Sequence, residues 1–171
     1  MRIVINDANI LIDLIHLNII DIFFQLENLE LRTTDFVFEE LLDEQKEILD
    51  VYIRDGFLTI IESTEEDLLR ISLILNNTRG LSFEDCSVWY FAKSINAILL
   101  TGDGRLRKQS LQDGVDVRGI LYVFDYLLLS GLITFELALV KINQLYQINN
   151  RLPVSAKDER LICWGRAEHV I

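Results

Sequence analysis

The chain has 171 residues, half of them hydrophobic, which suits one domain with a sizeable core. Its 16 basic and 27 acidic residues give a net charge of −11, which argues against strong nonspecific binding to nucleic acid. The two cysteines lie outside any C-x-x-C pair, which excludes a cysteine zinc cluster, and the two histidines argue against a histidine-rich site. Any bound metal must therefore have oxygen ligands.

The hydrophobic stretches are too interrupted to cross a membrane. Mean hydropathy is +0.26, but the two most apolar stretches, residues 10–24 and 123–140, both contain charged residues. A spanning helix needs about 20 nearly uncharged residues. The first residues also lack the regions of a signal peptide. We therefore expect a cytoplasmic protein with no membrane association.

Apolar patterning predicts alternating elements. In chain order these are a strand over residues 2–5, a helix over 9–26, a strand over 29–33, a helix over 34–52 and a strand over 57–61. Helices over 65–76 and 82–94, strands over 97–100 and 115–117, and a helical remainder follow. This alternation predicts an α/β domain with a mostly parallel sheet flanked by helices. We expect a main domain over residues 1–148 and a C-terminal extension over 149–171, packed on it.

Two aspartates each follow a purely apolar predicted strand. Asp7 comes just after the first strand, and Asp103 comes just after the strand at residues 97–100. Ligands of open parallel sheets bind beyond the carboxyl ends of the strands. If these strands are central neighbours, the two carboxylates face each other across one crevice.

Asp85 has two interpretations. Ser82 and Asp85 have the spacing of a capping box, in which Ser82 begins the helix and Asp85 completes the cap. Spacing alone favours plain capping. The helix that follows is heavily apolar, however, and an acid at the start of a buried helix can also point into the crevice.

Glu40 is a fourth acid, on the helix predicted to begin at Thr34. At about 100° per residue, Glu40 lies beside the apolar face of that helix, whereas Glu39 points away. A solvated helix edge is the simpler interpretation from the residues alone. Clustered carboxylates suit Mg²⁺ or Mn²⁺, because these ions prefer oxygen ligands and because unpaired buried charge is costly without a cation.

The residues around these acids resemble the PIN domain family, and more closely its prokaryotic branch of VapC-type toxins and stand-alone relatives. The resemblance covers nearly the whole chain, in the family's order, although each piece alone is weak. The matching pieces are residues 5–9 (INDAN), Thr34 to Leu41 (T-x-x-V-x-x-E-L), residues 81–87 (LSFEDCS) and residues 99–106 (LLTGDGRL), followed by residues 117–120 and 131–133.

The resemblance implies a three-layer α/β/α fold with a parallel five-stranded sheet. It also implies a metal-binding acidic site of Asp7, Glu40, Asp85 and Asp103, with Glu39 beside Glu40 leaving that register open by one residue. Asn9 and Thr101 would support the site through hydrogen bonds. The implied activity is Mg²⁺- or Mn²⁺-dependent RNA cleavage by a homodimer, and the implied context is a toxin paired with an antitoxin protein.

The basic residues Arg105, Arg107 and Lys108 follow Asp103. They are candidates for holding RNA phosphates, and equally for the exposed face of a short helix. His16 and His169 are assigned no role.

Two alternatives to a nuclease remain. A PIN fold kept only for dimerisation or for binding a protein partner would agree with the acidic charge. A metal-dependent phosphatase or a receiver-like domain fits poorly, since Asn9 stands where the phosphatase needs a second aspartate.

Overall fold

The computed structural model describes residues 1–149 and 152–168, except for the side chains of residues 166–168. Its centre is a five-stranded sheet in the order β3-β2-β1-β4-β5, in which every neighbouring pair is parallel. The strands are β1 (Arg2–Asn6), β2 (Leu29–Thr34), β3 (Leu58–Ile61), β4 (Ile98–Leu100) and β5 (Asp116–Arg118). The predicted parallel α/β sheet is confirmed.

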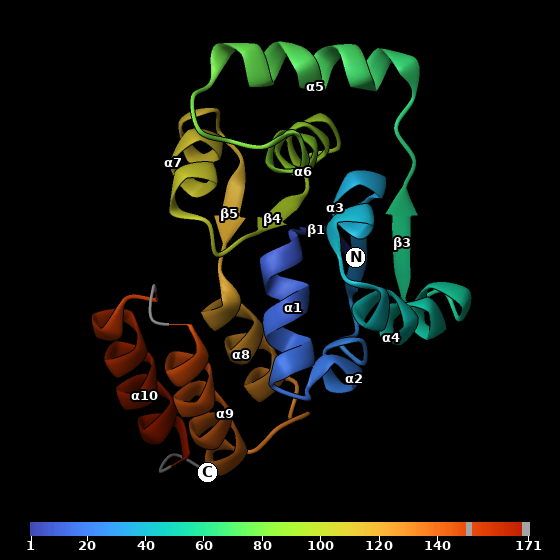
Figure 1. Ribbon diagram of the computed structural model, residues 1–171. Helices are drawn as coiled ribbons and strands as arrows, with labels where there is room; N and C mark the ends of the chain where they lie inside the picture. Colours follow the sequence, from blue (N-terminus) through green and yellow to red (C-terminus); the bar gives the residue numbers. More distant parts are fainter. Residues whose placement is uncertain (150–151, 169–171) are drawn as a thin grey trace.

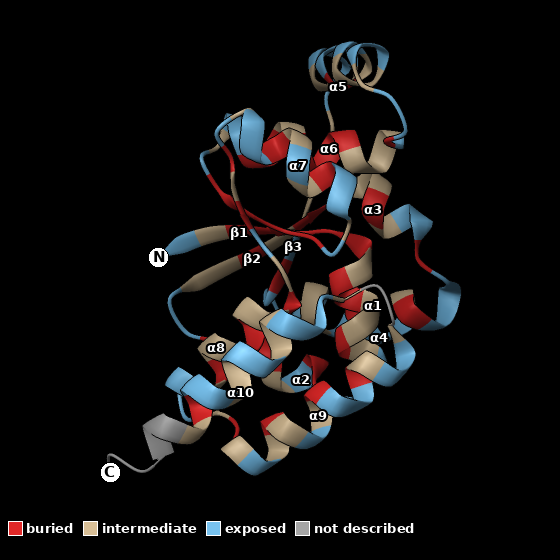
Figure 2. Ribbon diagram, turned by 90° about the vertical axis from the view of Figure 1, so that its left-hand side faces the viewer, coloured by how far each residue is buried: buried red, intermediate tan, exposed pale blue. Residues whose placement is uncertain are grey.

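Helices cover both faces of the sheet, as Figures 1 and 2 show. On one side lie α5 (Glu65–Asn77), α6 (Phe83–Ser94) and α7 (Gly104–Gln112), with α5 outermost. On the other side lie α1 (Ala8–His16), α2 (Ile20–Phe23) and α8 (Ile120–Leu129). The remaining helices are α3 (Asp35–Glu40), α4 (Asp43–Arg54), α9 (Phe135–Ile148) and α10 (Val154–Glu168). This is the expected three-layer α/β/α arrangement.

Two predicted helices are each divided in the structure. The helix expected over residues 9–26 is interrupted at Asn18, whose φ of 53° ends α1. The helix expected over residues 34–52 stops at Glu40, because Leu41 and Leu42 are extended, with ψ of 150° and 153°. Leu41 is buried while Leu42 is exposed. In this extended backbone the two successive leucine side chains point to opposite sides, Leu41 into the core and Leu42 to solvent.

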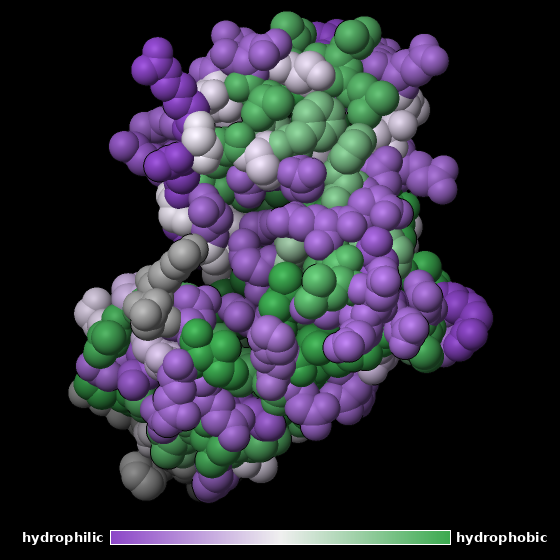
Figure 3. All heavy atoms as spheres, in the orientation of Figure 1, coloured by the Kyte–Doolittle hydropathy of each residue, from purple (hydrophilic) through white to green (hydrophobic). Residues whose placement is uncertain are grey.

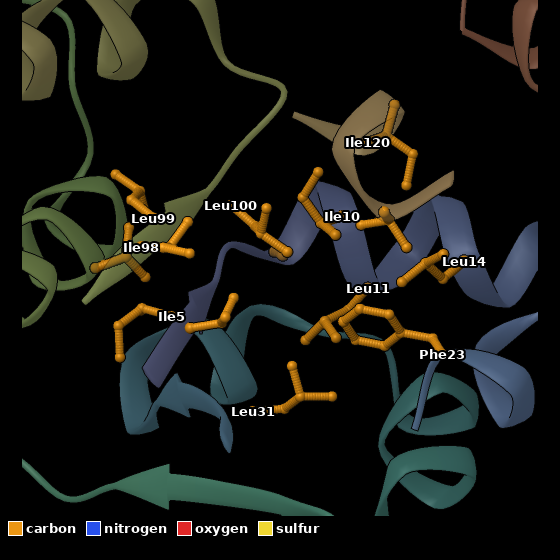
Figure 4. Packing of buried hydrophobic residues seen from close by; sticks show 14 of the residues in the cluster. Ile5, Ile10, Leu11, Leu14, Phe23, Leu31, Ile98, Leu99, Leu100 and Ile120 are labelled. Carbon is orange, nitrogen blue, oxygen red and sulfur yellow. The ribbon is translucent and has the colours of Figure 1, made fainter. Parts of the chain in front are cut away.

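Apolar packing places the ends of the central strands. Figure 4 shows side chains of α1 (Ile10, Leu11 and Leu14) gathered with those of neighbouring strands and helices, among them Leu31 and Leu100. Since β1 and β4 are neighbours, and Asn6 lies in register with Leu100, the chain leaves both strands at the same point of the sheet. Asp7 and Thr101 are therefore adjacent residues at one edge.

The last helices pack on the same body. The Arg160 Nε donates to both carboxylate oxygens of Asp125 on α8, at 3.0 and 2.9 Å, and the Trp164 indole donates to the same carboxylate at 2.9 Å. The extension expected from residue 149, with His169, falls partly outside the described residues, and its boundary stays a prediction. Within the described part of the chain, no helix is long and apolar enough to cross a membrane.

Candidate metal centre

Asp7 is the most buried acid of the predicted set. It lies between β1 and α1 with 4% of its surface exposed, and its backbone N–H donates to the Leu100 carbonyl at 3.0 Å. Its Oδ2 accepts two hydrogen bonds, from the Thr101 hydroxyl and from the Asn9 side-chain amide, each at 2.5 Å. No cation forms an ion pair with Asp7 among the described residues.

Asn9 and Thr101 also hold the loop that carries Asp103. The Gly102 N–H donates to Asn9 Oδ1 at 2.7 Å, and the Asp103 N–H donates to Thr101 Oγ1 at 3.0 Å. Gly102 approaches Asn9 closely, since a Cβ there would lie 3.1 Å from the amide oxygen. The two expected supporting residues thus connect the loops after β1 and β4.

Asp103 is the N-cap of α7. Its Oδ1 accepts from the backbone N–H groups of Arg105 at 2.9 Å and Leu106 at 2.7 Å. No protein donor within residues 1–149 and 152–165 contacts its second oxygen, Oδ2, which is therefore open to another partner.

Asp85 makes the capping box that its spacing predicts. The Ser82 N–H donates to Asp85 Oδ2 at 2.8 Å, and the Asp85 N–H donates to Ser82 Oγ at 3.1 Å. Capping occupies only one carboxylate oxygen. The negative charge of Asp85 also acts on Asp7 and on Glu40.

Glu40 is the last residue of α3, so its expected position beside a continuous helix face is wrong. The negative charges of Glu84 and Asp85 raise the pKa of the Glu40 carboxyl. Glu39 points elsewhere: its side chain is 77% exposed and binds the Lys46 ammonium at 3.0 Å. Glu40 is exposed as well, but it has no such ion pair among the described residues and the charge of Asp85 reaches it, so Glu40 stays the candidate for the acidic group.

Burial and neighbouring negative charge raise the pKa values of Asp7, Asp85 and Glu40. Burial raises the pKa of Asp7 to about 7, and the charge of Asp85 adds to this, while hydrogen bonds from Thr101, Ala8 and Asn9 oppose it. Burial also raises the pKa of Asp85, with contributions from the charges of Asp103 and Glu84. Burial, Glu84 and Asp85 raise the pKa of Glu40. Burial is the largest cause of all three shifts, and the neighbouring negative charges add to it.

Helix dipoles partly offset this repulsion. Asp7 and Asp103 are the N-caps of α1 and α7, and Asp85 lies in the first turn of α6. The positive end of a helix dipole favours an acid at each of these positions. Glu40 is the exception, since it ends α3, where the dipole is negative.

The donor set suits a hard divalent cation, but it is not closed around one. Within the described part of the chain, no three histidine, cysteine or acidic side chains converge tightly enough to hold a metal ion. One carboxylate oxygen of Asp85 and one of Asp103 already accept helix-capping hydrogen bonds. Carboxylate oxygens are the ligands that Mg²⁺ and Mn²⁺ prefer. Binding would therefore draw these side chains closer together.

The expected phosphate-binding cluster is largely engaged with the protein itself. The Arg107 guanidinium donates to the carbonyls of Val117 and Thr101, at 3.3 and 3.4 Å, and Arg105 donates to the Gly80 carbonyl at 2.9 Å. Burial lowers the pKa of Arg107. Lys108 is exposed and makes no ion pair among the described side chains.

Three polar residues near the site were given no role from the sequence. Glu84 acts on both Asp85 and Glu40. Thr34 and Ser87 share a hydrogen bond of 2.8 Å, although 53 residues separate them. Thr34 shows a local signal as the N-cap of α3, where it accepts from the Val37 N–H. No local pattern pairs it with Ser87.

The comparisons with known proteins agree with this fold and site. A family model described as "PIN domain" matches residues 3–165. A search of curated proteins found no significant match. Among solved structures, "VapBC-1 from nontypeable Haemophilus influenzae" is similar at a TM-score of 0.52 and 19% identity, over 70% of this chain and 98% of that chain. That likeness concerns the fold, and the family match spans nearly the whole sequence. The chain belongs to the PIN domain family.

Proposed function

We propose that this protein is a metal-dependent endoribonuclease in which Asp7, Glu40, Asp85 and Asp103 hold Mg²⁺ or Mn²⁺. The observation that carries the proposal is Asp7, a buried carboxylate with no cationic partner among the described residues, whose pKa is raised to about 7. A protein keeps such a group at a cost in stability. A divalent cation in the crevice removes that cost.

Each residue would contribute in a different way. Asp7 is held rigidly, because Thr101 and Asn9 fix one of its oxygens. Asp85 and Asp103 would each offer the metal the oxygen that capping leaves free, and Glu40 would add a carboxylate from the end of α3. A bound divalent ion would supply the activation of water and the charge needed at the scissile phosphodiester. Of the three basic residues after Asp103, Lys108 would contact RNA phosphates, because it is exposed and makes no ion pair among the described side chains, and Arg105 and Arg107 would help through the loops that they hold.

Partners follow from the same proposal. RNA is the substrate, and the protein acts as a cytoplasmic homodimer. The structural likeness to VapBC-1 supports a role as the toxin of a toxin–antitoxin pair, with an antitoxin protein as a further partner. Figure 3 shows hydrophilic side chains across the middle of the face on which α1 begins, which suits a polar substrate better than an apolar one.

Cleavage of RNA tests the proposal directly. Purified protein with Mn²⁺ should cut single-stranded RNA, and chelation should stop it. Asp7→Asn should abolish both cleavage and Mn²⁺ binding. Asp50→Asn, which removes an exposed carboxylate on α4, should leave both unchanged. If the native protein neither binds Mn²⁺ nor cuts any RNA, the nuclease proposal fails.

A second candidate is an inactive PIN-fold module that dimerises or binds a protein partner. Two observations favour it: no three metal donors converge among the described residues, and the net charge is −11. Calorimetric titration separates the two candidates. The module predicts no heat of Mn²⁺ binding together with a tight protein complex, whereas the nuclease predicts binding that depends on Asp7.

A further inference from the structure

Two fully buried hydroxyl groups connect the helices that carry Glu40 and Asp85. Thr34 and Ser87 both have 0% of their surface exposed, and their side-chain oxygens lie 2.8 Å apart. Thr34 is the N-cap of α3, which ends at Glu40, and Ser87 lies in α6, two residues after Asp85. The bond therefore joins two acid-bearing helices directly.

The direction of the hydrogen bonds is fixed. The Ser87 hydroxyl donates to the Glu84 carbonyl at 2.7 Å, because a carbonyl oxygen only accepts. Its single hydrogen is then used, so the Thr34 hydroxyl must be the donor to Ser87. Thr34 in turn accepts from the Val37 N–H at 3.3 Å. The chain of bonds runs from the first turn of α3 through both hydroxyls to the first turn of α6.

A second contact fixes the same two helices. The rings of Phe36 and Phe83 meet edge to face, with centroids 4.7 Å apart and an interplanar angle of 65°. Phe36 follows Thr34 in the first turn of α3, and Phe83 is the first residue of α6. Two neighbouring contacts restrict rotation between the helices more than one does. The variants proposed below leave this aromatic pair unchanged, so their effects report on the two hydroxyls.

The helix starts matter because the acids repel each other. Asp85 and Glu84 both act on Glu40, so nothing in this charge set draws α3 toward α6. Glu40 lies six residues beyond Thr34, about 9 Å along a helix at 1.5 Å per residue. A small rotation at Thr34 therefore moves the Glu40 carboxylate substantially.

We propose that Thr34 and Ser87 are positioning residues that hold Glu40 and Asp85 at the spacing needed for one divalent cation. This inference rests on the proposed function. Neither hydroxyl contacts the cation or the RNA. Residues that orient metal ligands without contacting the metal typically change metal affinity by about 10–100-fold when they are removed.

Mn²⁺ titration of single variants tests the role. Ser87→Ala and Thr34→Val should each weaken Mn²⁺ binding by about tenfold. Thr34→Ser, which keeps the hydroxyl, should restore most of the affinity. Ser110→Ala is the matched control, because Ser110 is also fully buried and its hydroxyl has no hydrogen-bond partner within the described chain. It should bind Mn²⁺ as the native protein does.

The double variant isolates the bond from the N-cap. If the two hydroxyls act through one hydrogen bond, removing the second hydroxyl should cost nothing further. The double variant, Thr34→Val with Ser87→Ala, should then have the same Mn²⁺ affinity as whichever single variant binds Mn²⁺ less tightly. Without metal, Ser87→Ala should also speed amide exchange in residues 35–40, and Ser110→Ala should not.

The outcomes separate this inference from the proposed function. Equal Mn²⁺ affinities in native protein, Ser87→Ala and Thr34→Val would overturn the positioning role alone. Fully additive losses in the double variant would also overturn it. If the native protein binds no Mn²⁺, the proposed function fails, and the positioning role fails with it even if amide exchange responds to Ser87→Ala.

Discussion

Replacing Asp7 by asparagine should stabilise the metal-free protein at alkaline pH. Burial raises the pKa of Asp7 from 3.8 to about 7 in the folded state. Between these two values the folded protein binds more protons than the unfolded chain does. The contribution of Asp7 to stability is therefore complete below pH 4 and is lost as the pH rises through 7. Asparagine has no charge to bury, and so it avoids this loss.

The magnitude follows from the shift. A change from 3.8 to about 7 is about 3 pKa units, and each unit corresponds to about 1.36 kcal/mol. The native protein should therefore lose up to about 4 kcal/mol, relative to Asp7→Asn, between pH 4 and pH 8. That is a large part of the 5–15 kcal/mol (roughly) that stabilises a typical domain.

Urea unfolding in the presence of a chelator measures this difference. The free energies of unfolding of native protein, Asp7→Asn and the exposed control Asp50→Asn should be compared at several pH values from 4 to about 8.5. The gap between native protein and Asp7→Asn should widen with pH, and that for Asp50→Asn should not. With the chelator left out, Mn²⁺ at about 100 times its dissociation constant should restore about 2.7 kcal/mol to the native protein and to Asp50→Asn, but not to Asp7→Asn. A gap that stays constant with pH would refute the reasoning.

Four further predictions concern other residues. Glu40→Gln should weaken Mn²⁺ binding by more than about tenfold in calorimetry, and Glu39→Gln should not; the reverse would move the site to Glu39. Arg107→Met should destabilise the protein by about 1–3 kcal/mol in urea unfolding, because two carbonyls lose their donor. Lys108→Ala should leave stability within about 0.5 kcal/mol but weaken RNA binding in a filter assay; unchanged RNA affinity would contradict its role. Asp125→Ala should lower the melting temperature and expose α10 to proteolysis, since that carboxylate accepts three hydrogen bonds from α10; unchanged digestion would contradict this.

The sequence alone determined the fold class and the placement of two acids. Strands and helices follow from the spacing of apolar residues, which is a local property of the chain. Asp7 and Asp103 could be placed because each follows an apolar strand, and residues after parallel strands leave the sheet at one edge. The Ser82–Asp85 cap was also visible, since its partners are three residues apart.

The tertiary structure decided which side chains meet. The break after Glu40 depends on Leu41 entering the core, so the helical pattern of residues 34–52 hid it. The sequence left Arg107 between phosphate binding and an exposed helix face, and only the fold brings its guanidinium to the carbonyls of Thr101 and Val117.

Asp7 itself shows the division most clearly. Its position after the first strand was a matter of sequence. Its burial, its hydrogen bonds from Thr101 and its raised pKa arise from residues 94 positions away and from packing that only the folded chain creates. Local patterns report local geometry, whereas desolvation and charge depend on every segment that folds against a residue.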